Sequence, residues 1–221
     1  MRLIICVFLV FCAGFTSRGQ TDDQMLWTKV GVEGKIIKKL SWSGEINSRF
    51  GSNGIETFFP EAGLEYKLLK WFRPSIQYRY VIDKNKYGNF KAASRISFNG
   101  AFKTKVNRFK LGLRMRYQYS FNQINTADKY AIFEHGLRLK PSIEYSIKGS
   151  KYTPLLSGEF FYQPKEGGAT TFYQKIRLSL GAKYKFNSSH RVAIKYQLNK
   201  GFRDFKEGSR HVLAVSYIYS L

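Results

Sequence analysis

Strict alternation of apolar and polar side chains is the feature that most constrains this chain, and it is clearest between His211 and Leu221. Every second position counted back from Leu221 is apolar or aromatic, whereas the positions between are smaller and more polar on average. A period of two places alternate side chains on opposite faces of a β-strand. A tilted strand needs roughly 9–11 residues to cross a bilayer. The pattern predicts a membrane-crossing strand, which we expect to close a β-barrel against its first strand.

The same alternation recurs along most of the chain, and helical periodicity is nearly absent. We therefore predict an all-β fold, a membrane-spanning antiparallel up-and-down β-barrel. Bacterial single-chain barrels normally have an even number of strands, so we expect about twelve, with ten as the alternative. A twelfth strand would lie within Asn53–Phe59 or Gln20–Thr28. The alternating segments are residues 26–36, 40–50, 60–68, 72–82, 95–102, 109–121, 137–145, 156–162, 172–186, 191–198 and 211–221.

Short and long connections alternate between these segments. Outer-membrane barrels have short turns on the periplasmic side and longer loops on the outer side, and the chain follows this arrangement as one domain. The expected short turns are residues 37–39, 69–70, 103–107, 148–150 and 187–189, and the expected long loops are residues 51–56, 83–89, 122–129, 163–170 and 200–210.

The N-terminus has the composition of a secretory signal peptide. Arg2 supplies a positive charge, residues 3–15 form an apolar run, and Ser17 and Gly19 are small residues before a cleavage site. We expect export to the outer membrane, with a signal peptide over residues 1–19 and a barrel over residues 20–221.

Cleavage at this site changes the chemistry available to the mature chain. Both cysteines, Cys6 and Cys12, would leave, which excludes disulfides, cysteine metal sites and cysteine nucleophiles. Loss of Arg2 and Arg18 leaves 37 − 2 = 35 basic against 15 acidic residues, a net charge near +20. The basic residues are spread at alternating positions rather than clustered, which argues against nucleic-acid binding.

Charged residues fall on the parity opposite to the apolar residues, where they would line the barrel lumen. One interpretation is a plugged interior in which opposite charges pair across strands. The other is an anion-preferring pore, because basic residues outnumber acidic ones on that face. About ten to twelve strands enclose little more than packed side chains, so we favour the plugged or very narrow lumen. The predicted lumen charges are Arg79, Arg95, Arg114, Arg116, Arg138, Arg177, Lys195, Glu45, Glu65, Glu144 and Glu159.

Aromatic residues near strand ends favour a membrane barrel over an exported soluble β-sandwich that binds an anionic ligand. Such side chains suit a membrane interface, with the ring in lipid and the hydroxyl in water. The residues concerned are Tyr78, Tyr80, Tyr117, Tyr119, Phe121, Tyr184, Phe186, Tyr217 and Tyr219.

Catalytic chemistry finds little support in the sequence. The alternative of an outer-membrane hydrolase acting on lipid or peptide rests on His135, which shares the apolar, lipid-facing parity of Leu137 and Leu139, and on His211 near Asp204. An Asp–His pair at the outer rim would suit activation of water. The three histidines share no metal-ligand spacing, and we expect neither a metal nor a cofactor.

Several short motifs spread over most of the mature chain carry a resemblance to a known family. They are Leu26-Trp27, Leu68-Leu69-Lys70-Trp71, Tyr78-Arg79-Tyr80, Leu137-Arg138-Leu139-Lys140 to Tyr152-Thr153-Pro154, Lys195-Tyr196-Gln197 and His211-Val212-Leu213. With these motifs the chain resembles the Bacteroidota outer-membrane family known as domain of unknown function 2490. That resemblance implies an outer-membrane β-barrel and no assigned chemistry, so no functional residues carry over. Leu221 departs from the aromatic residue with which members usually end.

Together these features predict a monomeric, non-enzymatic outer-membrane β-barrel that has a structural or surface role or passes small anionic solutes. The expected partners are outer-membrane lipid and the barrel-insertion machinery.

Overall fold

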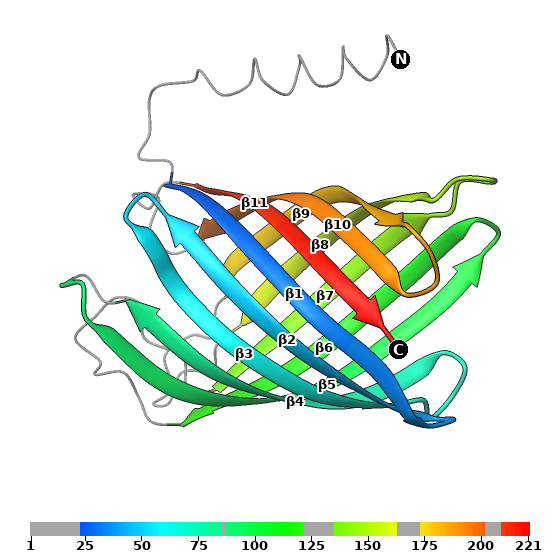
Figure 1. The fold of residues 1–221 in the computed structure, drawn as a ribbon, viewed down its shortest axis with the longest axis horizontal. Coiled ribbons are helices and arrows are strands. Elements are labelled where there is room, and N and C mark those ends of the chain that lie inside the picture. Colours follow the sequence, from blue (N-terminus) through cyan, green and yellow to red (C-terminus); the bar gives the residue numbers. More distant parts are fainter. Residues whose placement is uncertain (1–22, 85–86, 122–134, 163–172, 202–208) are drawn as a thin grey trace, which may run out of the picture.

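One closed β-sheet forms the whole of the described fold (Figure 1). The structure, a computed structural model, describes residues 23–84, 87–121, 135–162, 173–201 and 209–221. The expected signal peptide and its cleavage site lie outside these residues. The strands are β1 (Asp23–Ile37), β2 (Leu40–Gly51), β3 (Gly54–Tyr66), β4 (Phe72–Lys84), β5 (Phe90–Val106), β6 (Phe109–Phe121), β7 (His135–Tyr145), β8 (Tyr152–Tyr162), β9 (Tyr173–Lys185), β10 (His190–Gly201) and β11 (Arg210–Ser220).

Consecutive strands pair antiparallel, and the barrel closes where β1 pairs with β11 in parallel. The seam register runs from Asp23 opposite Arg210 to Glu33 opposite Ser220. The predicted all-β barrel is confirmed, and the alternative of a soluble sandwich is wrong because the wall is one closed sheet rather than two facing sheets.

The expected strand number of twelve or ten is corrected to eleven within the described residues. Both candidate positions for an additional strand belong to longer strands. Residues 54–59 form the first half of β3, which pairs with β2 through a turn at residues 52–53, so the expected long loop over residues 51–56 is also wrong. Residues from Asp23 onward are the start of β1. With an odd number of up-and-down strands, the first and the last run in the same direction, which explains the parallel seam.

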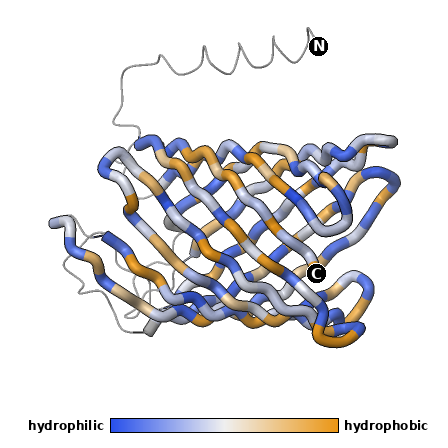
Figure 2. Tube along the Cα trace, viewed as in Figure 1, coloured by the Kyte–Doolittle hydropathy of each residue, from blue (hydrophilic) through white to orange (hydrophobic). Residues whose placement is uncertain are grey.

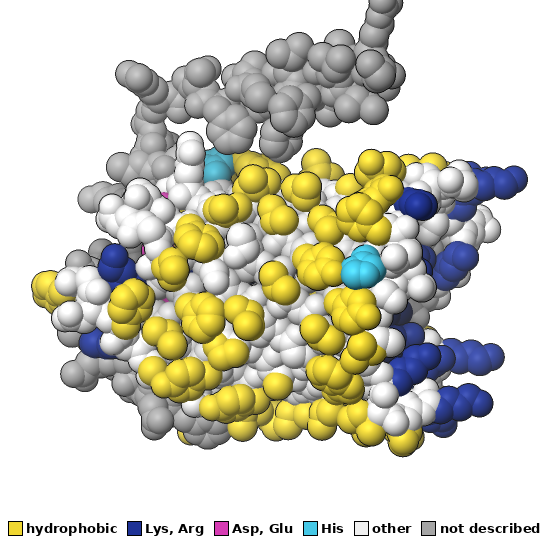
Figure 3. Space-filling model, viewed as in Figure 1, with side chains coloured by type: hydrophobic (Ala, Val, Ile, Leu, Met, Phe, Trp, Pro, Cys, Tyr) yellow, Lys and Arg dark blue, Asp and Glu magenta, His cyan; other side chains and the backbone are white. Residues whose placement is uncertain are grey.

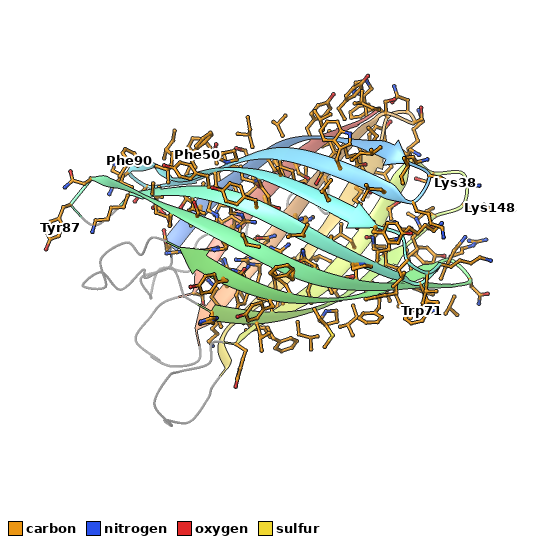
Figure 4. The ribbon with its side chains drawn as sticks, turned by 90° about the horizontal axis from the view of Figure 1, so that it is seen from below. Lys38, Phe50, Trp71, Tyr87, Phe90 and Lys148 are labelled. Carbon is orange, nitrogen blue, oxygen red and sulfur yellow. The ribbon has the colours of Figure 1, made fainter. Side chains whose placement is uncertain are left out.

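The two ends of the barrel differ, and each is named here by the strands that finish there. At the turn rim, β1, β3, β5, β7, β9 and β11 end, and the connections are short. At the loop rim, β2, β4, β6, β8 and β10 end, and the expected loops over residues 122–129 and 163–170 lie outside the described residues. Lys38, Trp71 and Lys148 mark the turn rim, and Phe50, Tyr87 and Phe90 mark the loop rim (Figure 4).

Two tight turns at the turn rim depend on left-handed backbone. Asn107, between β5 and β6, has φ of 53°, and Gly149, between β7 and β8, has φ of 71°. Asparagine and glycine tolerate this region better than other residues. These residue choices explain why the turns stay short.

Polarity is arranged inside out relative to a water-soluble protein. Large apolar side chains on the outer wall are exposed, including Leu180 at 58% and Ile46 at 54%, whereas interior Glu159 and Gln118 are each 2% exposed. Figure 2 shows hydrophobic and hydrophilic residues alternating along the strands, and Figure 3 shows apolar side chains spread over the visible outer wall. The buried apolar cluster of the described residues is small and comprises Phe59, Val81 and Ala93 on neighbouring strands β3 to β5.

Close packing between β9 and β10 requires a glycine at position 181. A Cβ atom there would lie 2.2 Å from the Ile194 carbonyl oxygen and 2.7 Å from the Lys195 Cα. Gly181→Ala is therefore expected to force the two strands apart and to lower the unfolding free energy by about 1–3 kcal/mol. Urea unfolding of the refolded barrel measures the loss. Gly44→Ala is the matched control, because its nearest contact would be Trp42 at 3.8 Å; equal losses would contradict the packing argument.

Candidate functional site

The barrel interior holds the charged residues that the sequence analysis singled out. Contacts between strands that are not neighbours in the wall place these side chains inside the barrel, because such contacts must cross the lumen. Arg114 on β6 reaches Glu159 on β8, and Lys183 on β9 reaches Glu144 on β7. The predicted residues lie on nine strands, with Glu45 on β2, Glu65 on β3, Arg79 on β4, Arg95 on β5, Arg114 and Arg116 on β6, Arg138 and Glu144 on β7, Glu159 on β8, Arg177 on β9 and Lys195 on β10.

Glu159, the most buried acidic residue that the structure describes, is the centre of a charge group that we call the Glu159 cluster (Glu159, Arg114, Arg138 and Arg177). Its Oε1 atom lies 2.9 Å from Arg114 Nη2 and 4.0 Å from Arg138 Nη1, and its Oε2 atom lies 3.2 Å from Arg177 Nη1. The Glu159 side chain is 3% exposed. One carboxylate therefore links β6, β7, β8 and β9 and balances one of three positive charges.

Guanidinium groups and aromatic rings extend this cluster across the lumen. Arg177 lies 4.7 Å from the Trp27 ring and 5.0 Å from the Phe161 ring, so it connects β9 to β1 and β8. Contacts of this kind contribute about 0.5–2 kcal/mol each, the larger values where water is excluded. The arginine–aromatic layer consists, in order of contact, of Arg138, Phe161, Arg177, Trp27, Arg49, Phe59 and Arg79.

Further hydrogen bonds fill the same level of the barrel. Arg116 donates to Asn99 Oδ1 and to Gln77 Oε1, each at 2.5 Å. Arg79 Nε donates to Glu61 Oε2 at 2.6 Å. Glu61 was not among the predicted lumen charges, although it shares the inward parity of Glu65. The additional contacts join β3 to β4, and β6 to β4 and β5, through interior side chains.

Other ion pairs of the interior are more exposed to solvent than the centre of the Glu159 cluster. The pairs Lys29–Glu45, at 3.0 Å, and Lys183–Glu144, at 2.5 Å, have side chains that are 21–33% exposed. By contrast, Arg138 and Arg177 in the Glu159 cluster are 16% and 12% exposed, although Arg114 is 33% exposed. We call the part of the interior with the arginine–aromatic layer the dry half, and the part with the two exposed pairs the solvated half.

Two interior lysines add positive charge that no carboxylate among the described residues balances. Among the described residues, neither Lys140 nor Lys195 takes part in an ion pair. Lys140 stands directly opposite Arg114 in the β6–β7 register. Like charges at opposed positions repel each other, so this part of the wall favours a nearby anion or water over a closed dry contact.

The histidines lie against tyrosines on neighbouring strands. His135 Nδ1 lies 2.7 Å from the Tyr117 hydroxyl, and His190 Nδ1 lies 2.6 Å from the Tyr217 hydroxyl. His211 forms the same contact with Tyr196. In each pair, the tyrosine lies two positions from the residue directly opposite the histidine on the neighbouring strand. The sequence analysis could not find these contacts because it did not include the register of the strands. Asp204, the acid expected beside His211, lies outside the described residues.

No helix within the described ranges is long and apolar enough to cross a membrane. The same ranges contain no group of three His, Cys, Asp or Glu side chains placed to hold a metal ion.

A comparison with models of known protein families shows which family this chain belongs to. The family model described as "Protein of unknown function (DUF2490)" matches residues 24–208. The chain belongs to this family. No curated protein matches it. The DUF2490 match includes every residue of the Glu159 cluster and of the arginine–aromatic layer, and it ends before β11. The Glu159 cluster and the arginine–aromatic layer therefore lie within the part of the chain that matches DUF2490.

Proposed function

We propose that this protein is an integral outer-membrane β-barrel with a plugged lumen and a structural, non-enzymatic role. The observation that carries the proposal is the inside-out distribution of polarity, with apolar side chains on the wall and ionic groups within. Export would follow from the signal peptide expected over residues 1–19, with the barrel-insertion machinery and outer-membrane lipid as partners.

The outer wall supports insertion in lipid. Leu180, Ile194 and Met115 lie on different strands and are each more than half exposed. Monomeric soluble proteins rarely expose a large contiguous apolar surface. A closed barrel with such a surface satisfies its backbone hydrogen bonds within the sheet, which is the requirement for crossing a bilayer.

Aromatic residues toward the turn rim extend this argument. Trp71 stacks on Phe102 with ring centroids 6.0 Å apart, and Tyr184 packs against Phe186 at 4.7 Å. Rings of aromatic residues flank the apolar band of transmembrane barrels at both interfaces. A monomer is favoured because the β1–β11 seam leaves no described strand edge unpaired.

The plugged lumen rests on the dry half of the interior. Rings and guanidinium groups contact one another from β4 around to β7, including the step across the lumen from Trp27 to Arg177. A conducting pore would need a continuous water-filled path, which this layer opposes.

A second candidate function is the passage of small anions. It is favoured by the cation excess of the interior, where Lys140 and Lys195 have no ion pair among the described residues. This candidate requires the arginine–aromatic layer to open, whereas the structural role does not.

Gel migration and bilayer conductance test the proposal together. We expect the outer-membrane fraction to contain a form that resists SDS and migrates differently until it is boiled, because a closed barrel stays folded in the detergent. We further expect no stable conductance steps when the refolded barrel is added to a planar bilayer. Recovery in the soluble periplasmic fraction without a migration shift would exclude the membrane barrel. Anion-selective steps would instead replace the plugged lumen with the second candidate.

A further inference from the structure

The turn rim carries an excess of positive charge that the lumen does not explain. Its connections, residues 38–39, 67–71, 107–108, 146–151 and 186–189, hold six lysines, one arginine and no acidic residue. The acidic residues near the turn-rim ends of β1 and β3, Glu33 and Glu65, are paired with Arg191 and Arg73. Figure 3 shows Lys and Arg side chains gathered at this end and extending beyond the apolar wall. The exposed turn-rim cations are Lys35, Lys38, Lys39, Lys67, Lys70, Lys103, Lys105, Arg108, Lys110, Lys148, Lys151 and Lys185.

The loop rim has a smaller excess of positive charge, because acidic residues make up a larger share of its described charged residues. Asp23 pairs with Arg210 across the seam at 2.7 Å. Asp83 and Lys84 are consecutive residues at the end of β4. The described charge of the barrel is therefore polarised along its axis, and an anionic surface would be attracted to the turn rim.

Apolar side chains are interleaved with these cations. Ile37 is 61% exposed and Trp71 is 52% exposed, and both lie within one or two residues of a turn-rim lysine. A soluble polyanion would require the positive charges alone. Exposed apolar and aromatic groups beside lysines are the combination found at the headgroup level of a bilayer. The further members of this apolar set are Ile36, Leu68, Leu69, Val106 and Ile147.

We propose that the turn rim binds the headgroups of anionic phospholipids in the leaflet that surrounds it. This inference rests on the proposed membrane location and adds to it a preference for lipid charge. Lysine and arginine side chains near an anionic membrane surface each strengthen binding by about five-fold. With the cations distributed over the five turns, the barrel collects negatively charged lipid around its whole circumference at that level.

Two charge-matched variants test the preference. The first combines Lys38→Gln, Lys70→Gln and Lys148→Gln at the turn rim. The control combines Lys84→Gln, Lys91→Gln and Lys200→Gln toward the loop rim, so that both variants lose three positive charges. Each barrel is reconstituted in vesicles of phosphatidylcholine with phosphatidylglycerol, released in mild detergent, and weighed by native mass spectrometry with its retained lipids.

We expect phosphatidylglycerol to be enriched over phosphatidylcholine on the unmodified barrel and on the loop-rim control. The turn-rim variant is expected to lose this enrichment by at least ten-fold, and added salt should weaken it, because exposed charges are screened. Equal loss in both variants, or no enrichment on the unmodified barrel, would overturn the inference. Binding to peptidoglycan sacculi without lipid enrichment would also overturn it.

The same experiment separates this inference from the proposed function. A barrel that enters the vesicles and shifts on SDS gels but retains no anionic lipid contradicts only the lipid preference. A chain that never enters the vesicles contradicts the membrane location itself.

Discussion

Glu159→Ala is expected to lower the unfolding free energy of the barrel by about 3–5 kcal/mol, because it leaves buried positive charge without its counter-charge. Arg138 and Arg177, at 16% and 12% exposed, would face each other without the carboxylate that lies between them. The measurement is urea unfolding of the barrel refolded in vesicles, followed by tryptophan fluorescence, since Trp27 contacts Arg177.

The control for this prediction is Glu144→Ala. Glu144 pairs with Lys183 in the solvated half, where the two side chains are 25% and 32% exposed. Solvated pairs contribute about 1 kcal/mol or less, so the control should unfold close to the unmodified barrel. A Glu159→Ala barrel as stable as the control would show that the Glu159 cluster does not hold the dry half together. Conductance of the Glu159→Ala barrel reports in addition whether the cluster keeps the lumen closed.

Leu180→Arg is expected to cost about 2–4 kcal/mol if the outer wall lies in lipid, because that is the cost of a basic residue at the middle of a bilayer. Leu180 lies mid-strand in β9 and is 58% exposed. In water, the same exposed position would accept arginine with little change, because surface substitutions usually alter stability by about 0.5 kcal/mol or less. The unfolding free energy of this variant in vesicles therefore shows whether the outer wall at Leu180 is surrounded by lipid or by water.

Ile147→Arg provides the depth control for this second prediction. Ile147 lies in the β7–β8 turn and is 41% exposed. Near the interface a basic residue costs about 0–1 kcal/mol. A large loss at Leu180 with a small loss at Ile147 supports a buried belt, and two small losses would indicate that water surrounds both residues.

Alternation in the sequence was enough to predict which side of the wall most residues occupy. In β4, Ile76 and Tyr78 are exposed on the outer wall, whereas Arg79 pairs with Glu61 inside. A strand has only two faces, so once one residue is correctly assigned to the inner or outer face, the faces of all the others follow. The period-two pattern therefore predicted the fold class.

Strand boundaries and partners inside the lumen were harder to predict. Pro60 lies within β3, although proline and the glycines around residues 51–54 indicate a break in a strand. Parity also says nothing of which inward residues meet, because that depends on the curvature and stagger of the closed sheet. The contact of Glu159 with Arg114, two strands away, arises from that geometry. The inward rings of Phe161 and Trp27 share the correct parity, but only packing shows that they hold arginines.

The parallel seam between β1 and β11 sets a condition on how the barrel is assembled. Asp23 and Arg210 pair across 187 positions of sequence. Contacts so distant in sequence tend to form slowly, so we expect this seam to form after the intervening strands. Until it forms, β1 and β11 each expose one unpaired backbone edge. These two edges run in the same direction, and pairing them is the expected final step of barrel closure.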